Sequence, residues 1–267
     1  MKKSFFPHAG NKSNIVEQIL ELVPEKYNVY YEPFLGSGIV FINLFPKKAV
    51  LNDIDFYVYN AWKAIEEDPE PVYDMCINTQ QEYNALCFMP HIKDSIINNL
   101  CGTLDSIQPN MVLEAAYWIN LKKISFNSTV YHEKGIISKP TGKKKISLSK
   151  YRDMLYIYNL LKNSDVDIHC EDYLKILKEV KKGDFVYLDP PYLDSNLQYT
   201  QNENNRELFS GIINEIDRLT KLGTYVLLSM EENEKVLEAF KDYNITKIKV
   251  WRYMSRRYTN ELLIKNY

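Results

Sequence analysis

The four residues Asp189-Pro190-Pro191-Tyr192 carry the clearest chemistry in this sequence. They close the apolar run 183–189, which is typical of a buried strand. In an open α/β sheet, ligands bind outside the carboxyl ends of the strands, so we expect this tetrapeptide to face a crevice. The two prolines stiffen the turn and lack N–H groups, which leaves their carbonyl oxygens available as acceptors.

Such a turn could activate an aromatic amine, which is a poor nucleophile because its lone pair is delocalised into the ring. The Asp189 carboxylate and the Pro190 carbonyl could accept the two N–H bonds of the amine and favour its pyramidal form, without a metal ion. The ring of Tyr192 offers a flat face to a base, and such stacking is worth about 1–3 kcal/mol. The alternative is a strand followed by a rigid turn with an ordinary capping acid.

A glycine-rich turn forms the second motif, Glu32-Pro33-Phe34-Leu35-Gly36-Ser37-Gly38. Its two glycines lie between a short β-rich run and an apolar helix, where a missing Cβ lets the backbone approach a ligand. Asp53 ends the next strand, from which a carboxylate can accept both ribose hydroxyls of a nucleoside. The full GxGxxG fingerprint is not formed because Ile39-Val40-Phe41 follows Gly38, which favours a smaller ligand than a dinucleotide. A plain tight connection is the alternative for the glycines.

Alternating strands and helices must position both motifs, and the hydrophobic periodicity predicts them. A change to amphipathic helical patterns marks the segment 60–147, with a β-hairpin expected around Glu133-Lys134-Gly135. The sequence therefore predicts an α/β fold, with a catalytic domain at 1–59 and 148–267 and a mostly helical insertion at 60–147. Outside that insertion, the expected elements are helices at 13–23, 39–45 and 205–221, and strands at 28–32, 48–53, 183–189, 223–229, 245–251 and 261–267.

The net charge of −2 says nothing about nucleic acid, but two local clusters are basic. Each could be a solvated face, yet their position on either side of a candidate active site favours a surface that contacts phosphates. The first cluster comprises Lys122, Lys123, Lys134, Lys139, Lys143, Lys144, Lys145 and Lys150, and the second Lys247, Lys249, Arg252, Arg256 and Arg257.

The four cysteines form no CxxC pair, which favours reduced core thiols over a zinc site or a disulfide framework. No apolar stretch reaches the 18 residues of a membrane span, and residues 1–7 lack the apolar core of a signal peptide. We therefore expect a cytoplasmic location, or the host cytoplasm or nucleus for a viral protein, and no membrane partner.

Five segments together resemble the Dam-type (D12 class) family of DNA adenine-N6 methyltransferases, in the order in which that family carries them. They are 7–12, with the sequence Pro-His-Ala-Gly-Asn-Lys, 32–38, Asn52-Asp53, 183–192 and 261–267. The resemblance spans most of the chain and implies a Rossmann-like methyltransferase sheet. It also implies that 60–147 is a target-recognition domain and that S-adenosylmethionine is the methyl donor.

The resemblance also implies roles for single residues. Asp189, Pro190, Pro191 and Tyr192 match the catalytic motif, and His8 stands where the family usually has Trp or Tyr. The residues expected to bind the cofactor are His8, Lys12, Glu32, Phe34, Gly36, Gly38, Asp53, Asp172 and Asp189.

The recognition region matches the family less closely. Phe126-Asn127 and Pro140-Thr141-Gly142-Lys143 resemble the two ends of the family's DNA-reading hairpin. GATC-specific relatives carry an Arg inside it, the usual reader of guanine, whereas 128–132 here contains none, so we predict no target sequence. The residues expected to bind DNA are Lys122, Asn127, Tyr131, Lys134, Pro140, Lys143, Lys144, Arg252 and Arg256.

These observations lead to the hypothesis that the protein flips an adenine out of double-stranded DNA and methylates its N6 amine. Methylation of the N4 amine of cytosine poses the same chemical problem and is the nearest alternative. An inactive, sequence-specific DNA-binding module is an alternative from another class, and an amine methyltransferase acting on protein or RNA would more often carry Asn at position 189. The sequence is compatible with protection of DNA from a separate cognate restriction endonuclease and with an independent role.

Overall fold

The computed structural model describes residues 1–86, 95–98, 100, 111–125, 128, 130, 132–133, 136–137, 145–192, 199–252 and 257–267. The chain forms two compact units. The first unit comprises Met1–Ser13, Gly36–Phe45 and Asp55–Cys170, and the second comprises Asn14–Leu35, Pro46–Ile54 and Glu171–Tyr267. The fold is mixed α/β with a seven-stranded sheet, as the sequence predicts for a Rossmann-like methyltransferase.

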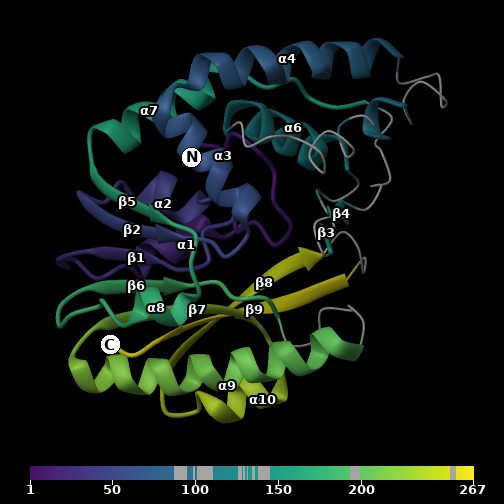
Figure 1. Cartoon of the computed structure of the whole chain (residues 1–267). Helices are drawn as coiled ribbons and strands as arrows, with labels where there is room; N and C mark the ends of the chain where they lie inside the picture. Colours follow the sequence, from purple (N-terminus) through teal and green to yellow (C-terminus); the bar gives the residue numbers. More distant parts are fainter. Residues whose placement is uncertain are drawn as a thin grey trace. The chain divides into compact units, whose positions relative to one another are not determined.

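The strands of the second unit stand in the order β2-β1-β6-β7-β9-β8 (Figure 1). β1, β2, β6 and β7 pair in parallel, whereas β9 runs antiparallel to both β7 and β8. Parallel strands covered on both faces are continuous apolar runs, and all four residues of β6 are buried. The bounds of these strands are β1 (Tyr30–Glu32), β2 (Lys48–Asn52), β6 (Phe185–Leu188), β7 (Tyr225–Glu231), β8 (Asn244–Arg252) and β9 (Arg257–Lys265).

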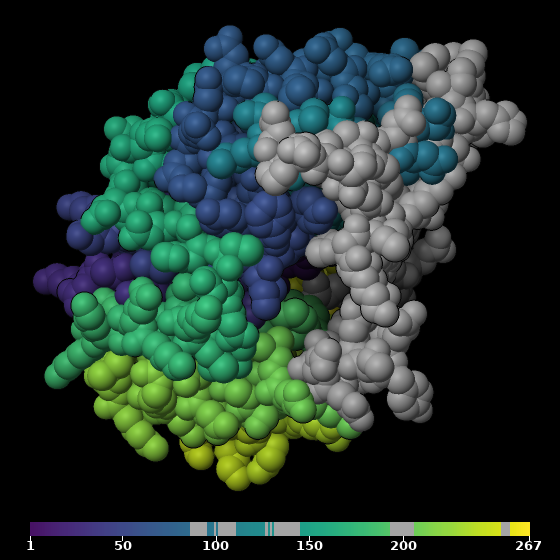
Figure 2. Space-filling model, in the orientation of Figure 1, coloured from purple at the N-terminus to yellow at the C-terminus, as the bar shows by residue number. Residues whose placement is uncertain are grey.

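A long amphipathic helix, α9 (Tyr199–Leu222), runs along one face of this sheet beside β7 (Figure 1). Its buried residues Ile212, Ile216 and Leu219 recur at helical spacing and join a core cluster that contains Val226 and Leu228 of β7. Figure 2 shows the light-green atoms of α9 at the surface. The other helices of the unit are α1 (Val16–Glu21), α8 (Tyr173–Leu177) and α10 (Glu234–Ala239).

The described residues of the first unit are mostly helical, and this unit extends beyond the segment 60–147 at both ends. Its interior contains the fully buried indoles of Trp62 and Trp118, and Asp55 caps α3 by accepting a hydrogen bond from the backbone N of Tyr57 at 2.9 Å. The expected hairpin around Glu133-Lys134-Gly135 is confirmed by the antiparallel pair β3 and β4. The elements are α2 (Ile39–Leu44), α3 (Phe56–Glu67), α4 (Pro69–Leu86), α6 (Met111–Ile124), β3 (His132–Glu133), β4 (Ile136–Ile137), α7 (Tyr151–Lys162) and β5 (Asp165–His169).

Two of the cysteines, Cys76 and Cys170, lie in the described part of the chain, and neither forms a disulfide. Burial raises the pKa of the Cys76 thiol to about 12, so this residue stays protonated in the core. Among the described residues there is no group of three or more side chains that could hold a metal ion. None of the described helices combines the length and hydropathy needed to cross a membrane.

Candidate active site

Three adjacent parallel strands of the second unit end at one edge of the sheet. Glu32, the last residue of β1, pairs with Leu51 of β2, and Tyr31 pairs with Val186 of β6. The residues that follow these strands are Pro33, Asp53 and Asp189. The structure therefore brings the start of the glycine-rich motif, the ribose-binding candidate and the catalytic candidate to the same edge, where open α/β sheets bind ligands.

Asn52, at the end of β2, links three segments at this edge of the sheet through hydrogen bonds. Its side-chain Nδ2 donates to the carbonyl oxygens of Pro33 at 3.0 Å and Glu171 at 2.9 Å, and its Oδ1 accepts from the backbone N of Glu171 at 2.9 Å. Its own carbonyl oxygen accepts from the backbone N of Leu35 at 2.8 Å. Asn52 is 1% exposed, so these bonds satisfy a polar group that burial would otherwise destabilise.

The same arrangement places the predicted cofactor residue Asp172 directly after the anchored Glu171. Asp172 caps α8, because its Oδ1 accepts a hydrogen bond from the backbone N of Leu174 at 2.8 Å. The ring of Phe34 packs against that of Tyr173, with centroids 5.3 Å apart. Phe34 and Asp172 thus lie on segments that a hydrogen-bonded strand end and an aromatic pair hold in place.

Glu32 is buried, with 3% of its area exposed to solvent. The hydroxyl of Tyr30 donates to its Oε2 at 2.7 Å. Burial, and then the charge of Glu32, hold the pKa of Tyr30 well above its usual value, so this hydroxyl remains a donor. The carboxylate of Glu32 is therefore fixed by its own strand.

In the first unit, the turn from Gly36 to Gly38 packs against the segment 7–12. Gly36 and Gly38 have left-handed φ angles of 49° and 61°. A Cβ on Gly36 would stand 3.1 Å from Cδ2 of His8, so the imidazole occupies the space that glycine leaves. Asn11 Nδ2 donates to Ser37 Oγ at 2.9 Å, and buried Lys12 donates from Nζ to the carbonyl oxygen of Gly10 at 3.1 Å.

His8 is a neutral imidazole at pH 7. Burial, and then the nearby ammonium group of Lys122, lower the pKa of His8 to about 3, although Asp55 acts in the opposite direction. The Nδ1 atom is shielded from solvent and makes no hydrogen bond to the part of the chain that the structure describes. A flat, uncharged ring with a polar atom available therefore stands beside the glycine turn.

Lys122, expected to bind DNA, is 5% exposed on α6. Its Nζ lies 4.8 Å from the ring centroid of Trp118, a distance at which the cation is attracted to the indole face. The ammonium group is therefore directed at an aromatic ring in the interior.

In the tetrapeptide predicted to be catalytic, Pro190 is buried and Pro191 is exposed, while Asp189 and Tyr192 are half-buried. The hydroxyl of Tyr192 donates to Oε1 of Glu261 at 2.7 Å. Glu261 belongs to the fifth segment of the resemblance, but the residue types and spacing gave no signal that it contacts Tyr192.

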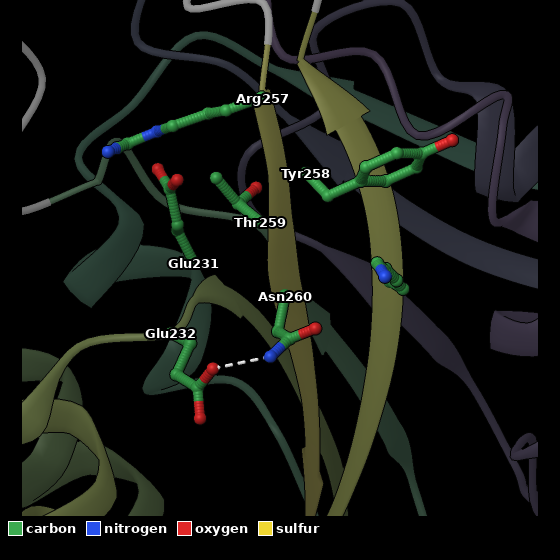
Figure 3. A pocket seen from close by; sticks show the side chains of 7 residues that line it. Glu231, Glu232, Arg257, Tyr258, Thr259 and Asn260 are labelled. Carbon is green, nitrogen blue, oxygen red and sulfur yellow. Dashed lines mark hydrogen bonds between the residues drawn. The ribbon is translucent and has the colours of Figure 1, made fainter.

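Two cavities lie at the end of β7 in the second unit. The larger, about 590 Å³, is lined by Glu231, Glu232, Lys249, Arg257, Tyr258, Thr259 and Asn260. Figure 3 shows Arg257 above Glu231, and the hydrogen bond of 2.6 Å from Asn260 Nδ2 to Glu232. The smaller, about 130 Å³, is lined by Tyr192, Met230, Glu231, Glu232, Asn233, Val236 and Arg257. Tyr192 thus borders an open space that also presents cationic and acidic groups.

Comparison with known proteins decides the family. The model of the D12 class N6 adenine-specific DNA methyltransferases matches residues 8–254. The chain belongs to this family.

The relatives of this D12 class chain carry consistent names. Type II methyltransferase M1.LlaDCHI of Lactococcus lactis subsp. cremoris is 28% identical, over 99% of this chain and 95% of the relative. Type II methyltransferase M.MjaIII of Methanocaldococcus jannaschii is 26% identical, over 99% of each. A DNA adenine methylase of Haemophilus influenzae is 21% identical, over 98% of this chain and 91% of the relative.

As a D12 class methyltransferase, the chain methylates the N6 amine of adenine in DNA. This group is an exocyclic aromatic amine, the nucleophile for which the turn after β6 is suited. The resemblance inferred from the sequence is confirmed, and so are the α/β fold class and the adenine-specific activity.

Most residues expected to bind DNA lie outside the described part of this D12 class chain. They are Asn127, Tyr131, Lys134, Pro140, Lys143, Lys144 and Arg256. Arg252 ends β8, and its backbone alone is described. The assignment of these residues to DNA binding stays a prediction.

Proposed function

We propose that the chain uses S-adenosylmethionine as its methyl donor and binds it through the residues predicted from the sequence. The donor set suits a nucleoside that carries an amino-acid chain. Asp53, at the strand end, suits two ribose hydroxyls, and Phe34 suits the face of an adenine. The imidazole of His8 packs against the glycine turn at Gly36, so its flat ring would border the cofactor from that side. When bound, this cofactor supplies an electrophilic methyl group on a sulfonium.

On this proposal, the residues after β6 hold and activate the target amine. The carboxylate of Asp189 and the carbonyl oxygen of Pro190 accept hydrogen bonds from the two N6–H groups, which directs the nitrogen lone pair at the methyl group. Flipping the adenine out of the duplex costs about a few kcal/mol, because the base loses its stacking and pairing partners. Tyr192 then stacks on the ring of the flipped adenine and offsets part of this cost. The single observation that supports this mechanism is the shared edge of β2, β1 and β6, from which Asp53, Pro33 and Asp189 emerge.

We also propose that residues 60–147 form the target-recognition domain, and that the β3-β4 hairpin contacts DNA. The basic end of the β8-β9 hairpin would add phosphate contacts, with Arg252 and Arg256 as contributors. The chain would thus bind double-stranded DNA through two hairpins, β3-β4 and β8-β9.

The product of the reaction tests the proposed activity. DNA from cells that express the chain is digested to nucleosides and analysed by mass spectrometry, and modification-sensitive sequencing locates the methylated site. We expect N6-methyladenine at one recurrent sequence. N4-methylcytosine would support the cytosine alternative, and site-specific DNA binding without any methylated base would support the inactive module.

The cofactor is tested separately by calorimetry with S-adenosylmethionine. We expect binding by the wild-type chain and weaker binding after Asp53→Ala, because the ribose hydroxyls lose their acceptor. Binding that Asp53→Ala leaves unchanged would contradict the ribose assignment.

Two relatives are named Type II methyltransferases, which supports a role as the methyltransferase of a restriction-modification pair. We propose that the chain protects DNA from a separate endonuclease with the same target sequence. DNA methylated by the chain should resist that endonuclease, and equal cleavage of methylated and unmethylated DNA would contradict the proposal.

A further inference from the structure

The hydroxyl of Tyr192 is anchored to a carboxylate on another part of the sheet. Tyr192 follows β6, whereas Glu261 lies on β9, on the far side of β7. The donor oxygen of Tyr192 lies 2.7 Å from Oε1 of Glu261, in a contact between residues 69 positions apart. We infer that Glu261 is a positioning residue, which holds the ring of Tyr192 in the orientation needed to stack on the target adenine. This inference rests on the proposed role of Tyr192.

Strand pairing explains why Glu261 can reach this hydroxyl. Glu261 pairs with Glu231 in the antiparallel ladder between β7 and β9. Ser229 lies two residues before Glu231 and so projects from the same face of the sheet, within reach of Glu261. Ser229 Oγ donates to the same Oε1 atom at 2.8 Å. Two donors thus converge on one carboxylate oxygen and fix its position.

The burial of Glu261 indicates that the arrangement is costly to maintain. Glu261 is 1% exposed and Ser229 is 0% exposed. A buried carboxylate destabilises a fold unless hydrogen bonds compensate it, and an apolar residue would be tolerated better in a strand that continues as Leu262 and Leu263. Charge-assisted bonds from Ser229 and Tyr192 supply this compensation. The residue that we place under the adenine therefore supplies one of the hydrogen bonds that stabilise the buried carboxylate.

The anchor matters because a hydrogen bond at the hydroxyl end of Tyr192 restricts the rotation of its ring. Tyr192 lines the cavity of about 130 Å³ together with Met230 and Val236. Fixing the hydroxyl end limits rotation of the ring and holds it ready for the base. Such preorganisation accelerates a reaction because less conformational entropy is lost on reaching the transition state. Loss of the anchor should therefore lower kcat more than it lowers the affinity for the cofactor.

Three variants test the anchor, on a duplex that carries the site identified by sequencing. Glu261→Ala removes the acceptor, Tyr192→Phe removes the donor but keeps the ring, and the third variant combines both. We expect each single variant to lower kcat about tenfold or more, as for loss of a hydrogen bond to a charged group. The double variant should lose no more than either single variant, because the two groups act through one bond.

A conservative variant and a spectroscopic probe separate positioning from simple destabilisation. Glu261→Gln keeps a carbonyl oxygen that can accept from Tyr192, so it should recover most of kcat. A 2-aminopurine in place of the target adenine should fluoresce more brightly in complex with Glu261→Ala than with wild type, because the extruded base stacks less firmly on the ring.

Asp184→Ala is the matched structural control. Asp184 is also a buried carboxylate, 2% exposed, that accepts backbone hydrogen bonds at the opposite end of β6. We expect both alanine variants to lower the melting temperature, but only Glu261→Ala to change kcat and the fluorescence of 2-aminopurine. Equal effects of the two variants, or wild-type kcat in a folded Glu261→Ala protein, would overturn the inference. A wild-type chain that forms no N6-methyladenine would instead refute the proposed function.

Discussion

At the scale of single residues, the site depends on polar groups that burial forces into fixed partners. Glu32 accepts from Tyr30, and Glu261 accepts from Tyr192. Because an unsatisfied buried polar group costs about 1–3 kcal/mol, each of these contacts is stable enough to define a geometry. Chemical groups at the sheet edge are therefore positioned before any substrate arrives.

Lys122 illustrates how burial changes the expected role of a residue. We expect Lys122→Met to lower the free energy of unfolding by about 1 kcal/mol, because methionine keeps the length but loses the attraction to Trp118. The affinity for DNA and its dependence on salt concentration should stay as in wild type. Chemical denaturation and DNA binding at several salt concentrations measure both quantities. A salt slope reduced by about one would instead show that Lys122 neutralises a phosphate.

At the scale of elements, the end of β2 organises the loops on both sides. Asn52 makes three side-chain hydrogen bonds, to Pro33 and twice to Glu171. We expect Asn52→Leu to lower the free energy of unfolding by about 3 kcal/mol, at about 1 kcal/mol for each lost bond. It should also weaken the binding of S-adenosylmethionine, because the segments that carry Phe34 and Asp172 lose their anchor.

Asn260→Leu is a suitable control for Asn52→Leu. Asn260 also bonds a neighbour through its side chain, to Glu232, but in the cavity beside β8. It should leave cofactor affinity unchanged. If both variants bind the cofactor as tightly as wild type, the strand end does not organise the cofactor loops.

The elements that sequence patterns predicted well are those with strong periodicity. β6 is a continuous apolar run, and the two strands expected at 245–251 and 261–267 overlap β8 and β9. α9 begins at Tyr199, before the expected start at 205, because its first residues are polar and show no apolar period. The pair of Tyr192 and Glu261 could not be predicted, since it depends on which strands are neighbours in the sheet. The hydrogen bonds from Asn52 to Pro33 and Glu171 could not be predicted for the same reason.

At the scale of the whole molecule, folding stability should depend on pH through His8. The pKa of His8 falls from 6.5 in the unfolded chain to about 3 in the folded chain, so between these values the unfolded state binds more protons. The stabilisation is complete above pH 6.5 and is lost as the pH falls toward 3. The expected slope is at most about 1.4 kcal/mol per pH unit.

The variant His8→Tyr isolates this effect, because tyrosine is uncharged across this pH range and keeps an aromatic ring at this position. Urea unfolding at pH 7 and pH 5 measures the difference. We expect the wild type to lose up to about 2 kcal/mol more than His8→Tyr on acidification. Parallel losses in the two proteins would show that His8 is not the group responsible.

The central claim is that the turn after β6 activates the adenine amine, while most of the cofactor affinity comes from residues outside this turn. Single-turnover methyl transfer by Asp189→Ala, measured together with calorimetric binding of S-adenosylmethionine, tests it most directly. We predict that methyl transfer slows by about a hundredfold to a thousandfold, the size of effect seen when a group that stabilises developing charge is removed. Cofactor affinity should stay within about threefold of wild type, less than 1 kcal/mol. Methyl transfer at the wild-type rate by the folded variant would contradict the account.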